Sequence, residues 1–284
     1  MRGNKRTKRF DAGEFTGRFF LYLILIIIAV ITFTPFYIML INATRSTQEI
    51  NMGITLIPGN ALIENYKSMM VSMDIWQGFK NSLIVAIPST ILSGYFGALT
   101  AYAFSKFKFR GNKFLFWFIL ATMMIPIQLG LIGYYQLTAK IHIINTFWAL
   151  ILPTVANAAT VFFLKMYIDA NVHESLLEAA RVDGSSGFYT FNRIVLPIIM
   201  PGVATMSILN FIFSWNNYLS PLILLFDKDK FTLPILIALV KGTYKQNLGA
   251  QYLAVAISVI PILIAFMFFS KYIISGITVG ALKE

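Results

Sequence analysis

The sequence contains no cysteine, and only two of its 284 residues, His142 and His173, are histidines. The lack of cysteine excludes disulfides, thiolate chemistry and cysteine-based metal sites. The two histidines lie too far apart in sequence to indicate a histidine-rich metal cluster. The chain also lacks the Gly-x-x-x-x-Gly-Lys-Ser/Thr pattern that binds nucleotide phosphates. Any ATP-driven activity would therefore require a nucleotide-binding site on another subunit.

Charged residues are scarce as well. They make up 12% of the sequence, whereas 57% of it is hydrophobic, and the mean hydropathy is +0.72. Soluble domains average about 25% charged and about 45–50% apolar residues. This composition excludes a soluble protein and indicates one that lies largely within a membrane.

Six apolar stretches are long enough to cross a bilayer as helices, which takes about 20 residues. Near their ends they contain Lys165 and Lys271, and otherwise no Asp, Glu, Lys, Arg or His. The sequence predicts an all-α integral membrane protein with a basic tail at 1–18, a membrane domain at 19–275 and a short tail at 276–284. The predicted spans are 19–42, 82–104, 114–136, 145–167, 194–225 and 251–273.

Lysine and arginine are unequally divided between the two sides of these spans. If the N-terminus is inside, fifteen of the 23 lysine and arginine residues fall on the cytoplasmic side and eight fall outside. Basic connections stay in the cytoplasm, so both termini and the segment 169–197 are predicted to be cytoplasmic. The basic tail then lies against anionic lipid headgroups. The net charge of +11 therefore requires no nucleic-acid partner.

The fifth stretch combines polar side chains with excess length. At 1.5 Å per residue it would measure roughly 50 Å, against a hydrocarbon core of about 30 Å. Pro197, Pro201 and Pro221 offer places to interrupt it. A broken, polar helix is typical of a transport path, although its amides would also suit hydrogen bonds between packed helices. The candidate pathway residues are Asn210, Ser214, Trp215, Asn216, Asn217 and Tyr218.

The missing charges within the spans also bear on what is carried. Proton- and sodium-coupled carriers usually hold ionisable groups at membrane depth. The sequence therefore disfavours a secondary carrier, which stays the first alternative. A path without fixed charge favours a neutral cargo. Amides, hydroxyls and aromatic faces suit a sugar, which offers many hydroxyls and apolar ring faces.

The polar segment 169–197 separates the fourth and fifth stretches. Gly184 suits the left-handed end of a first helix, and Ser185 or Ser186 can cap a second one. By composition alone, this elbow would fit either a partner protein or the membrane surface. Apolar residues recur at helical spacing in both halves, first Val172, Leu176, Ala179 and Ala180, then Phe188, Phe191 and Ile194.

Within this segment, seven residues follow the spacing E-A-A, three residues, Gly, nine residues, I-x-L-P. The segment resembles the EAA loop of permease subunits of ATP-binding-cassette (ABC) importers. His173 and Ser175 depart from the usual Pro and Glu, which changes how the loop helix begins. Four further stretches are similar to the carbohydrate-uptake branch of that family, namely 101–111, 124–126, 214–225 and 275–284.

The resemblance implies a type I ABC importer permease core of six helices that works by alternating access. It implies four kinds of partner: a second homologous permease, two ATPase subunits that carry ATP and Mg²⁺, an extracytoplasmic solute-binding protein, and a neutral sugar or oligosaccharide substrate. This chain itself would be a non-enzymatic, cofactor-free, multi-pass protein of a bacterial or archaeal inner membrane. A permease for a non-sugar solute stays the second alternative. The residues implied in ATPase coupling are Glu178, Ala179, Ala180, Arg181, Asp183, Gly184, Ile194, Leu196 and Pro197.

Overall fold

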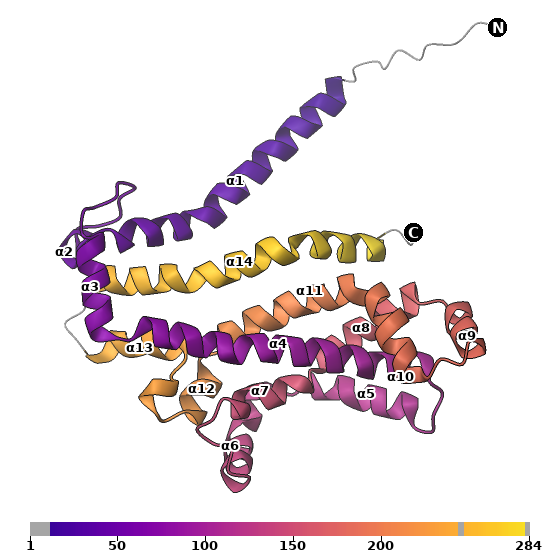
Figure 1. Cartoon of the computed structure of the whole chain (residues 1–284). Coiled ribbons are helices and arrows are strands. Elements are labelled where there is room, and N and C mark those ends of the chain that lie inside the picture. The colour runs from indigo at the N-terminus through magenta and orange to yellow at the C-terminus, as the bar shows by residue number, and fades with distance from the viewer. Residues whose placement is uncertain (1–11, 244–246, 282–284) are drawn as a thin grey trace, which may run out of the picture. The chain divides into compact units, whose positions relative to one another are not determined.

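The structure is a computed structural model that describes residues 12–243 and 247–281. Every regular element in those two ranges is helical, and neither range contains a β-strand (Figure 1). The prediction of an all-α protein is therefore confirmed. The chain divides into two compact units.

Unit 1 comprises Met1–Val71 and Tyr244–Ala256. Its elements are α1 (Ala12–Ala43), α2 (Thr47–Asn51), most of α3 (Leu62–Ser72) and the start of α14 (Leu248–Ala281).

Short polar contacts hold α2 and α3 at the end of α1. Ser46 begins α2 with a capping box, in which its side chain and that of Glu49 each pair with the other's backbone N–H. Asn65 on α3 is buried, and its amide donates hydrogen bonds of 2.9 Å to the carbonyls of Ala43 and Arg45. These bonds satisfy a buried amide and two carbonyls at the end of α1.

Unit 2 comprises Ser72–Thr243 and Ile257–Glu284. Three of its helices pack side by side (Figure 1): α4 (Ile75–Lys106), α8 (Ala158–Asn171) and α11 (Leu196–Trp215). The shorter elements are α7 (Trp148–Val155), α9 (Glu174–Val182), α10 (Gly187–Thr190), the π-turn η2 (Phe191–Val195), α12 (Leu219–Leu224), the 3-10 turn η3 (Lys228–Lys230) and α13 (Leu233–Thr243).

Small residues on α4 allow α8 and α11 to approach it closely. A Cβ atom at Gly97 would lie 2.6 Å from Cγ2 of Thr160 on α8. A Cβ atom at Gly94 would lie 3.2 Å from Oγ of Ser207 on α11. Helices in lipid gain little from hiding apolar surface against one another, so close van der Waals contact supplies much of their association.

The third predicted span, 114–136, is not one straight helix. α5 (Asn112–Thr122) is followed by the 3-10 turn η1 (Ile127–Gly130) and α6 (Leu131–Lys140), and the two halves meet at 93°. Pro126 accounts for the break, because it has no N–H to donate to the preceding turn.

Five helices in the described residues are long and apolar enough to cross a membrane, and the bent pair α5–α6 would make a sixth. This agrees with the six predicted spans, but the bounds of the second and the fifth were wrong. The second span begins at Ile75, because the Asp74 side chain caps it, and the fifth runs from Gly187 to Trp215. The five are Gly17–Ala43, Ile75–Lys106, Trp148–Asn171, Gly187–Trp215 and Leu248–Ser270.

The predicted tails are partly helical. α1 begins at Ala12, inside the predicted tail 1–18, and α14 runs to Ala281, inside the predicted tail 276–284. Residues 1–11 and 282–284 lie outside the described part of the chain. The contact of the basic tail with lipid headgroups therefore stays a prediction.

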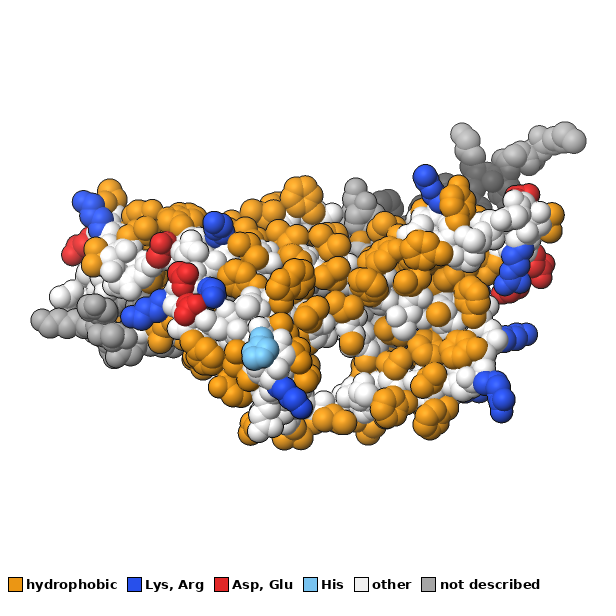
Figure 2. All heavy atoms as spheres, turned by 60° about the horizontal axis from the view of Figure 1, so that its bottom comes forward, with side chains coloured by type: hydrophobic (Ala, Val, Ile, Leu, Met, Phe, Trp, Pro, Cys, Tyr) orange, Lys and Arg blue, Asp and Glu red, His pale blue; other side chains and the backbone are white. Residues whose placement is uncertain are grey.

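Side chains are distributed as expected for a protein that crosses a bilayer. On the face shown in Figure 2, hydrophobic side chains cover much of the middle, and most of the charged ones lie toward the two ends. Helices that span a membrane keep charge out of the hydrocarbon and place it near the interfaces.

Candidate functional site

The segment predicted to be a coupling loop begins with α9, which Gly184 ends. Gly184 has φ +74°, a conformation that costs a residue with a side chain more than it costs glycine. Its N–H donates to the carbonyl of Arg181 over 3.0 Å, and the N–H of Ser185 donates to that of Ala180 over 2.9 Å. These two bonds form a Schellman motif. The predicted left-handed end at Gly184 is confirmed.

The faces of α9 differ in part from the predicted stripe. Val172 and Ala180 are buried, but Leu176 and Ala179 are exposed, and Leu177 is buried with the first two. The reason is that α8 ends at Val172 in an extended conformation, so α9 starts with a new helical phase. Glu178, Ala179 and Arg181, which belong to the predicted coupling set, therefore share an exposed surface with Leu176.

The second half of the segment is not a separate helix. The Ser186 side chain accepts a hydrogen bond from the N–H of Tyr189 and so caps α10, which confirms the predicted cap. From Gly187 the helix continues through the π-turn η2 into α11 as a single run to Trp215. Pro197 explains the π-turn in part, because it cannot donate the regular bond to residue 193.

The π-turn anchors this run in the core of unit 2. Phe191 is buried and lies against the rings of Tyr95 and Tyr102 on α4, at centroid distances of 5.8 and 5.6 Å. The hydroxyl of Tyr95 also donates to Oδ1 of Asn192 over 3.1 Å. Phe188, predicted to share the face of Phe191, is 63% exposed. The segment is therefore joined to α4 as well as to α11.

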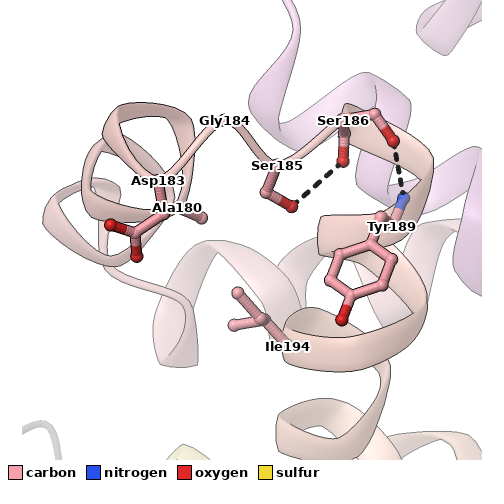
Figure 3. A pocket seen from close by; sticks show the side chains of 7 residues that line it. All are labelled: Ala180, Asp183, Gly184, Ser185, Ser186, Tyr189 and Ile194. Atoms are coloured by element: carbon pink, nitrogen blue, oxygen red, sulfur yellow. Dashed lines mark hydrogen bonds between the residues drawn. The ribbon is translucent and has the colours of Figure 1, made fainter.

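A cavity of about 500 Å³ opens in the bend between α9 and α10. Figure 3 shows Asp183 and Ala180 on one side, Tyr189 on the other and Ile194 facing them both. The cavity is lined by the carboxylate of Asp183 and by hydroxyl groups, and Ile194 adds an apolar side chain. The cavity brings together four of the predicted coupling residues with Tyr189, which the sequence did not single out. It is lined by Ala180, Asp183, Gly184, Ser185, Ser186, Tyr189 and Ile194.

A group of polar side chains that the sequence did not reveal ties α4 to α8 just before this loop. The ammonium of Lys106 donates to the carbonyl of Val172 over 2.6 Å. Ser105 donates its hydroxyl proton to Asp169 over 2.5 Å, and Lys165 pairs with the other oxygen of Asp169 at 2.6 Å. We call Ser105, Lys106, Lys165, Asp169 and Val172 the α4–α8 clamp. Only the i, i+4 pair of Lys165 and Asp169 was visible as a pattern in the sequence.

The pathway candidates differ in exposure: Trp215 is buried, Asn216 and Tyr218 are exposed, and the other three are half-buried. Asn210 uses its amide within unit 2: its NH₂ donates to Ser93 and Thr160 over 3.0 Å, and its carbonyl oxygen accepts from Asn157 over 2.9 Å. These bonds join α4, α8 and α11. For Asn210 the structure therefore supports the packing role that the sequence had left open.

Trp215 is likewise a packing residue. Its side chain is 2% exposed, stacks on Phe211, meets the ring of Phe79 edge-on at 5.4 Å, and donates from Nε1 to the carbonyl of Ser258 over 3.0 Å. Burial of an indole with its N–H satisfied is a strong local anchor.

The helix breaks directly after Trp215, so this stretch is interrupted as predicted, but not at the predicted places. Pro197 and Pro201 lie within α11, and Pro221 lies within α12. Asn216 and Tyr218 are exposed at the break, and Ser214 is half-buried. The side chain of Asn217, just before the N-cap residue of α12, accepts from the N–H of Ser220 over 3.3 Å. The side chains of Asn216 and Tyr218 are therefore exposed, whereas those of Asn210 and Trp215 are used by the fold.

A second polar connection lies between α12 and α13. Asp227 accepts hydrogen bonds from Lys230 and from Asn145, over 2.8 and 2.7 Å. These two bonds, that from Lys230 first, lower the pKa of Asp227 below its ordinary value of 3.8. The side-chain oxygen of Asn145 in turn accepts the N–H groups of Phe226 and Asp227. Within the described residues, no group of three or more His, Asp or Glu side chains is placed to hold a metal ion.

These features define the class of the protein: it is a helical membrane protein with a polar elbow between two of its spans. Residues 91–279 match the family described as binding-protein-dependent transport system inner membrane component. The chain belongs to this family. It is a multi-pass inner-membrane protein and the permease subunit of a binding-protein-dependent importer.

Relatives cover almost the whole chain. The arabinooligosaccharides transport system permease protein AraQ of Halalkalibacterium halodurans is 35% identical over 260 residues, which are 90% of this chain and 93% of that protein. The diacetylchitobiose uptake system permease protein NgcG of Streptomyces coelicolor is 30% identical over 264 residues, 92% of this chain and 87% of that protein.

The fold is also known from a solved structure. A crystal structure of a bacterial ABC transporter involved in the import of the acidic polysaccharide alginate contains a chain with a TM-score of 0.80 and 20% identity. The match covers 94% of this chain and 99% of that one. At this identity it shows the fold of an ABC importer permease.

Proposed function

We propose that this chain carries a neutral sugar or oligosaccharide across the membrane by alternating access, driven by two ATPase subunits that bind residues 174–197. A second, homologous permease would complete the path, and an extracytoplasmic binding protein would deliver the solute. Both termini and the coupling loop lie in the cytoplasm in this proposal. ATP hydrolysis belongs to the ATPase subunits, which hold the nucleotide and Mg²⁺.

The coupling role rests on the geometry of 174–197. Its exposed surface offers Glu178 and Arg181 beside the small Ala179, so a partner can approach the α9 backbone closely. The cavity beside Asp183 and Tyr189 offers a socket for a protruding side chain. The two hydrogen bonds around Gly184 fix the angle of the elbow. The second half of the elbow is continuous with α11, so a displacement of the coupling loop would move a spanning helix directly.

The mechanism follows from that continuity. Closure of the ATPases on ATP would move the elbow, and the run from Gly187 to Trp215 would transmit the motion to the break at Asn216. Since the helix is interrupted there, α12 can change its direction without unfolding α11. Hydrolysis would return the elbow to its starting position.

A sugar cargo is supported by two observations of different kinds. The two relatives named above are permeases for arabinooligosaccharides and for diacetylchitobiose by name. In addition, the exposed side chains at the α11–α12 break are an amide and a phenol, Asn216 and Tyr218. Neutral donors, acceptors and an aromatic ring suit the hydroxyls and ring faces of a sugar and supply no opposite charge to a charged solute.

Co-purification with reconstitution tests this proposal. The chain would be isolated in mild detergent from its native membrane, and its partners would be identified by mass spectrometry. The reassembled complex in vesicles should take up a neutral oligosaccharide only with ATP and the binding protein present. Uptake by the chain alone would indicate a secondary carrier, and ATP-dependent uptake of charged solutes only would contradict the sugar assignment.

A further inference from the structure

Unit 1 contains an uncharged loop, residues 52–61, between α2 and α3. Its sequence, M-G-I-T-L-I-P-G-N-A, contains no Asp, Glu, Lys, Arg or His. Its large apolar side chains point away from the rest of the chain: Ile54 is 81% exposed, Leu56 61% and Ile57 73%. Such a cluster of apolar side chains outside a spanning helix is costly in water.

The loop is held in one conformation at its base. Arg45 is itself buried and donates to the carbonyl of Gly53 over 3.1 Å. Thr44 accepts the N–H of Gly59 on its hydroxyl over 2.9 Å and the N–H of Ala61 on its carbonyl over 2.8 Å. With both ends tied, the loop cannot turn its apolar side chains inward to hide them.

A hydrogen bond fixes the position of the loop along the axis of α1. The hydroxyl of Tyr37 donates to the carbonyl of Leu56 over 3.0 Å, so the loop turns back beside the last turns of α1 (Figure 1). Tyr37 lies six residues before the end of α1 at Ala43, which is roughly 9 Å along the helix axis. α1 is a membrane-spanning helix, and tyrosine hydroxyls concentrate at the level of the lipid headgroups.

We propose that the loop 52–61 inserts Ile54, Leu56 and Ile57 into the adjoining lipid leaflet and anchors unit 1 at the membrane interface. The surface next to it supports lipid as the occupant, because only 6% of the spanning part of α1 is buried within the chain. A protein-binding surface would be expected to carry aromatic or arginine side chains at its centre, and the loop 52–61 has neither.

The absence of native cysteine permits a direct test with single-cysteine variants of the full chain. The assembled transporter would carry Ile54→Cys or Ile57→Cys and would be reconstituted in phosphatidylcholine–phosphatidylglycerol vesicles. Ile31→Cys, on the exposed surface of α1, serves as the lipid reference. Lys67→Cys, exposed on α3, serves as the aqueous reference.

A fluorescent thiol label at position 54 or 57 should be quenched by lipid-borne nitroxide as strongly as the label at position 31. In separate, unlabelled samples, the cysteine thiol at position 54 or 57 should react with a membrane-impermeant maleimide roughly tenfold or more slowly than the thiol at position 67, because a thiol in hydrocarbon does not ionise. Reaction as fast as at position 67 would overturn the proposal. Protection from both reagents would overturn it too, because it would mean that a protein covers the loop.

Tyr37→Phe, combined with Ile54→Cys, tests whether the hydrogen bond from Tyr37 fixes the depth of the loop in the membrane. Without the phenolic hydroxyl, the label at position 54 should be quenched less by nitroxide placed near the headgroups. The quenching of the label at position 31 should stay the same. An unchanged depth in this variant would show that Tyr37 does not position the loop.

Discussion

The ammonium group of Lys106 donates a hydrogen bond of 2.6 Å to the carbonyl of Val172, the residue that ends α8. This carbonyl belongs to the last turn of a helix, where backbone oxygens are without helical partners and carry partial negative charge. The bond therefore joins the end of α4 to the end of α8, two residues before α9 begins. It fixes the point from which the coupling loop extends.

Lys106→Met should impair coupling more than folding. The variant removes a charged donor from the end of α8, a change worth about 1.5–3 kcal/mol when such a bond is well formed. We expect transport to fall several-fold at unchanged membrane abundance, while the complex still hydrolyses ATP. Paired assays of uptake and ATPase rate in vesicles measure this. Lys106→Arg should restore most of the coupling, and Lys108→Met, an exposed neighbour, should behave as wild type.

Gly184→Pro should abolish transport, and Gly184→Ala should weaken it. A side chain at φ +74° costs about 1–2 kcal/mol, and proline also removes the N–H that bonds to Arg181. The readout is the amount of ATPase that co-purifies with the chain. Gly133→Ala is the matched control, because it lies in a helix with nothing within 4 Å of the added Cβ. Wild-type ATPase recovery with Gly184→Pro would contradict the coupling role.

Much of this fold could be predicted because lipid simplifies the problem. Length and missing charge identify the spans, and the left-handed conformation at Gly184 follows from residue type. The phase of α9 could not be predicted, because it depends on the extended residue at Val172 and not on the spacing of apolar residues. For the same reason Leu177, rather than Leu176, faces the core.

The polar residues of the fifth span show a different limit of sequence reasoning. Asn210 and Asn216 are chemically identical, yet one forms hydrogen bonds with three side chains of other elements and the other is exposed. Which amide finds partners depends on the positions of Ser93 and Thr160, far away in sequence. The two bonds of the α4–α8 clamp that join the two helices were missed for the same reason, since they cross 64 and 66 residues.

Asn210→Ala and Asn216→Ala should therefore have separate effects. The first removes interhelical hydrogen bonds, worth about 0.6 kcal/mol each on average in membrane proteins, and should lower the thermal midpoint in detergent with little change in substrate affinity. The second should change the KM for the transported sugar and leave the thermal midpoint as it is. Equal thermal midpoints and equal KM values for both variants would remove the distinction.

Glu178→Lys should prevent the ATPase subunits from binding while the chain stays in the membrane. Glu178 is exposed on α9, so the substitution reverses a charge on the proposed contact surface without opening the core. Uptake should be lost, and the ATPase should no longer co-purify. Glu64→Lys, an exposed carboxylate on α3 in unit 1, controls for the change in net charge. Full assembly of the Glu178→Lys complex would contradict the proposed contact.

Asp227 gives a prediction about pH. Its folded-state pKa is lowered, first by the hydrogen bond from Lys230 and then by that from Asn145, so the ionised carboxylate stabilises the connection between α12 and α13. This stabilisation is present above the unfolded pKa of about 3.9 and is lost as the pH falls through the lowered folded value. The protection of the Phe226 and Asp227 amides from hydrogen exchange, relative to their intrinsic exchange rates at each pH, should therefore fall below pH 4. In the Asp227→Asn variant the same two amides should lose protection already at neutral pH. The Asp229→Asn variant should keep the wild-type dependence of protection on pH, because the Asp229 side chain makes neither of these two bonds. Unchanged protection at acid pH in the wild-type chain would mean that the two hydrogen bonds to Asp227 do not hold the connection.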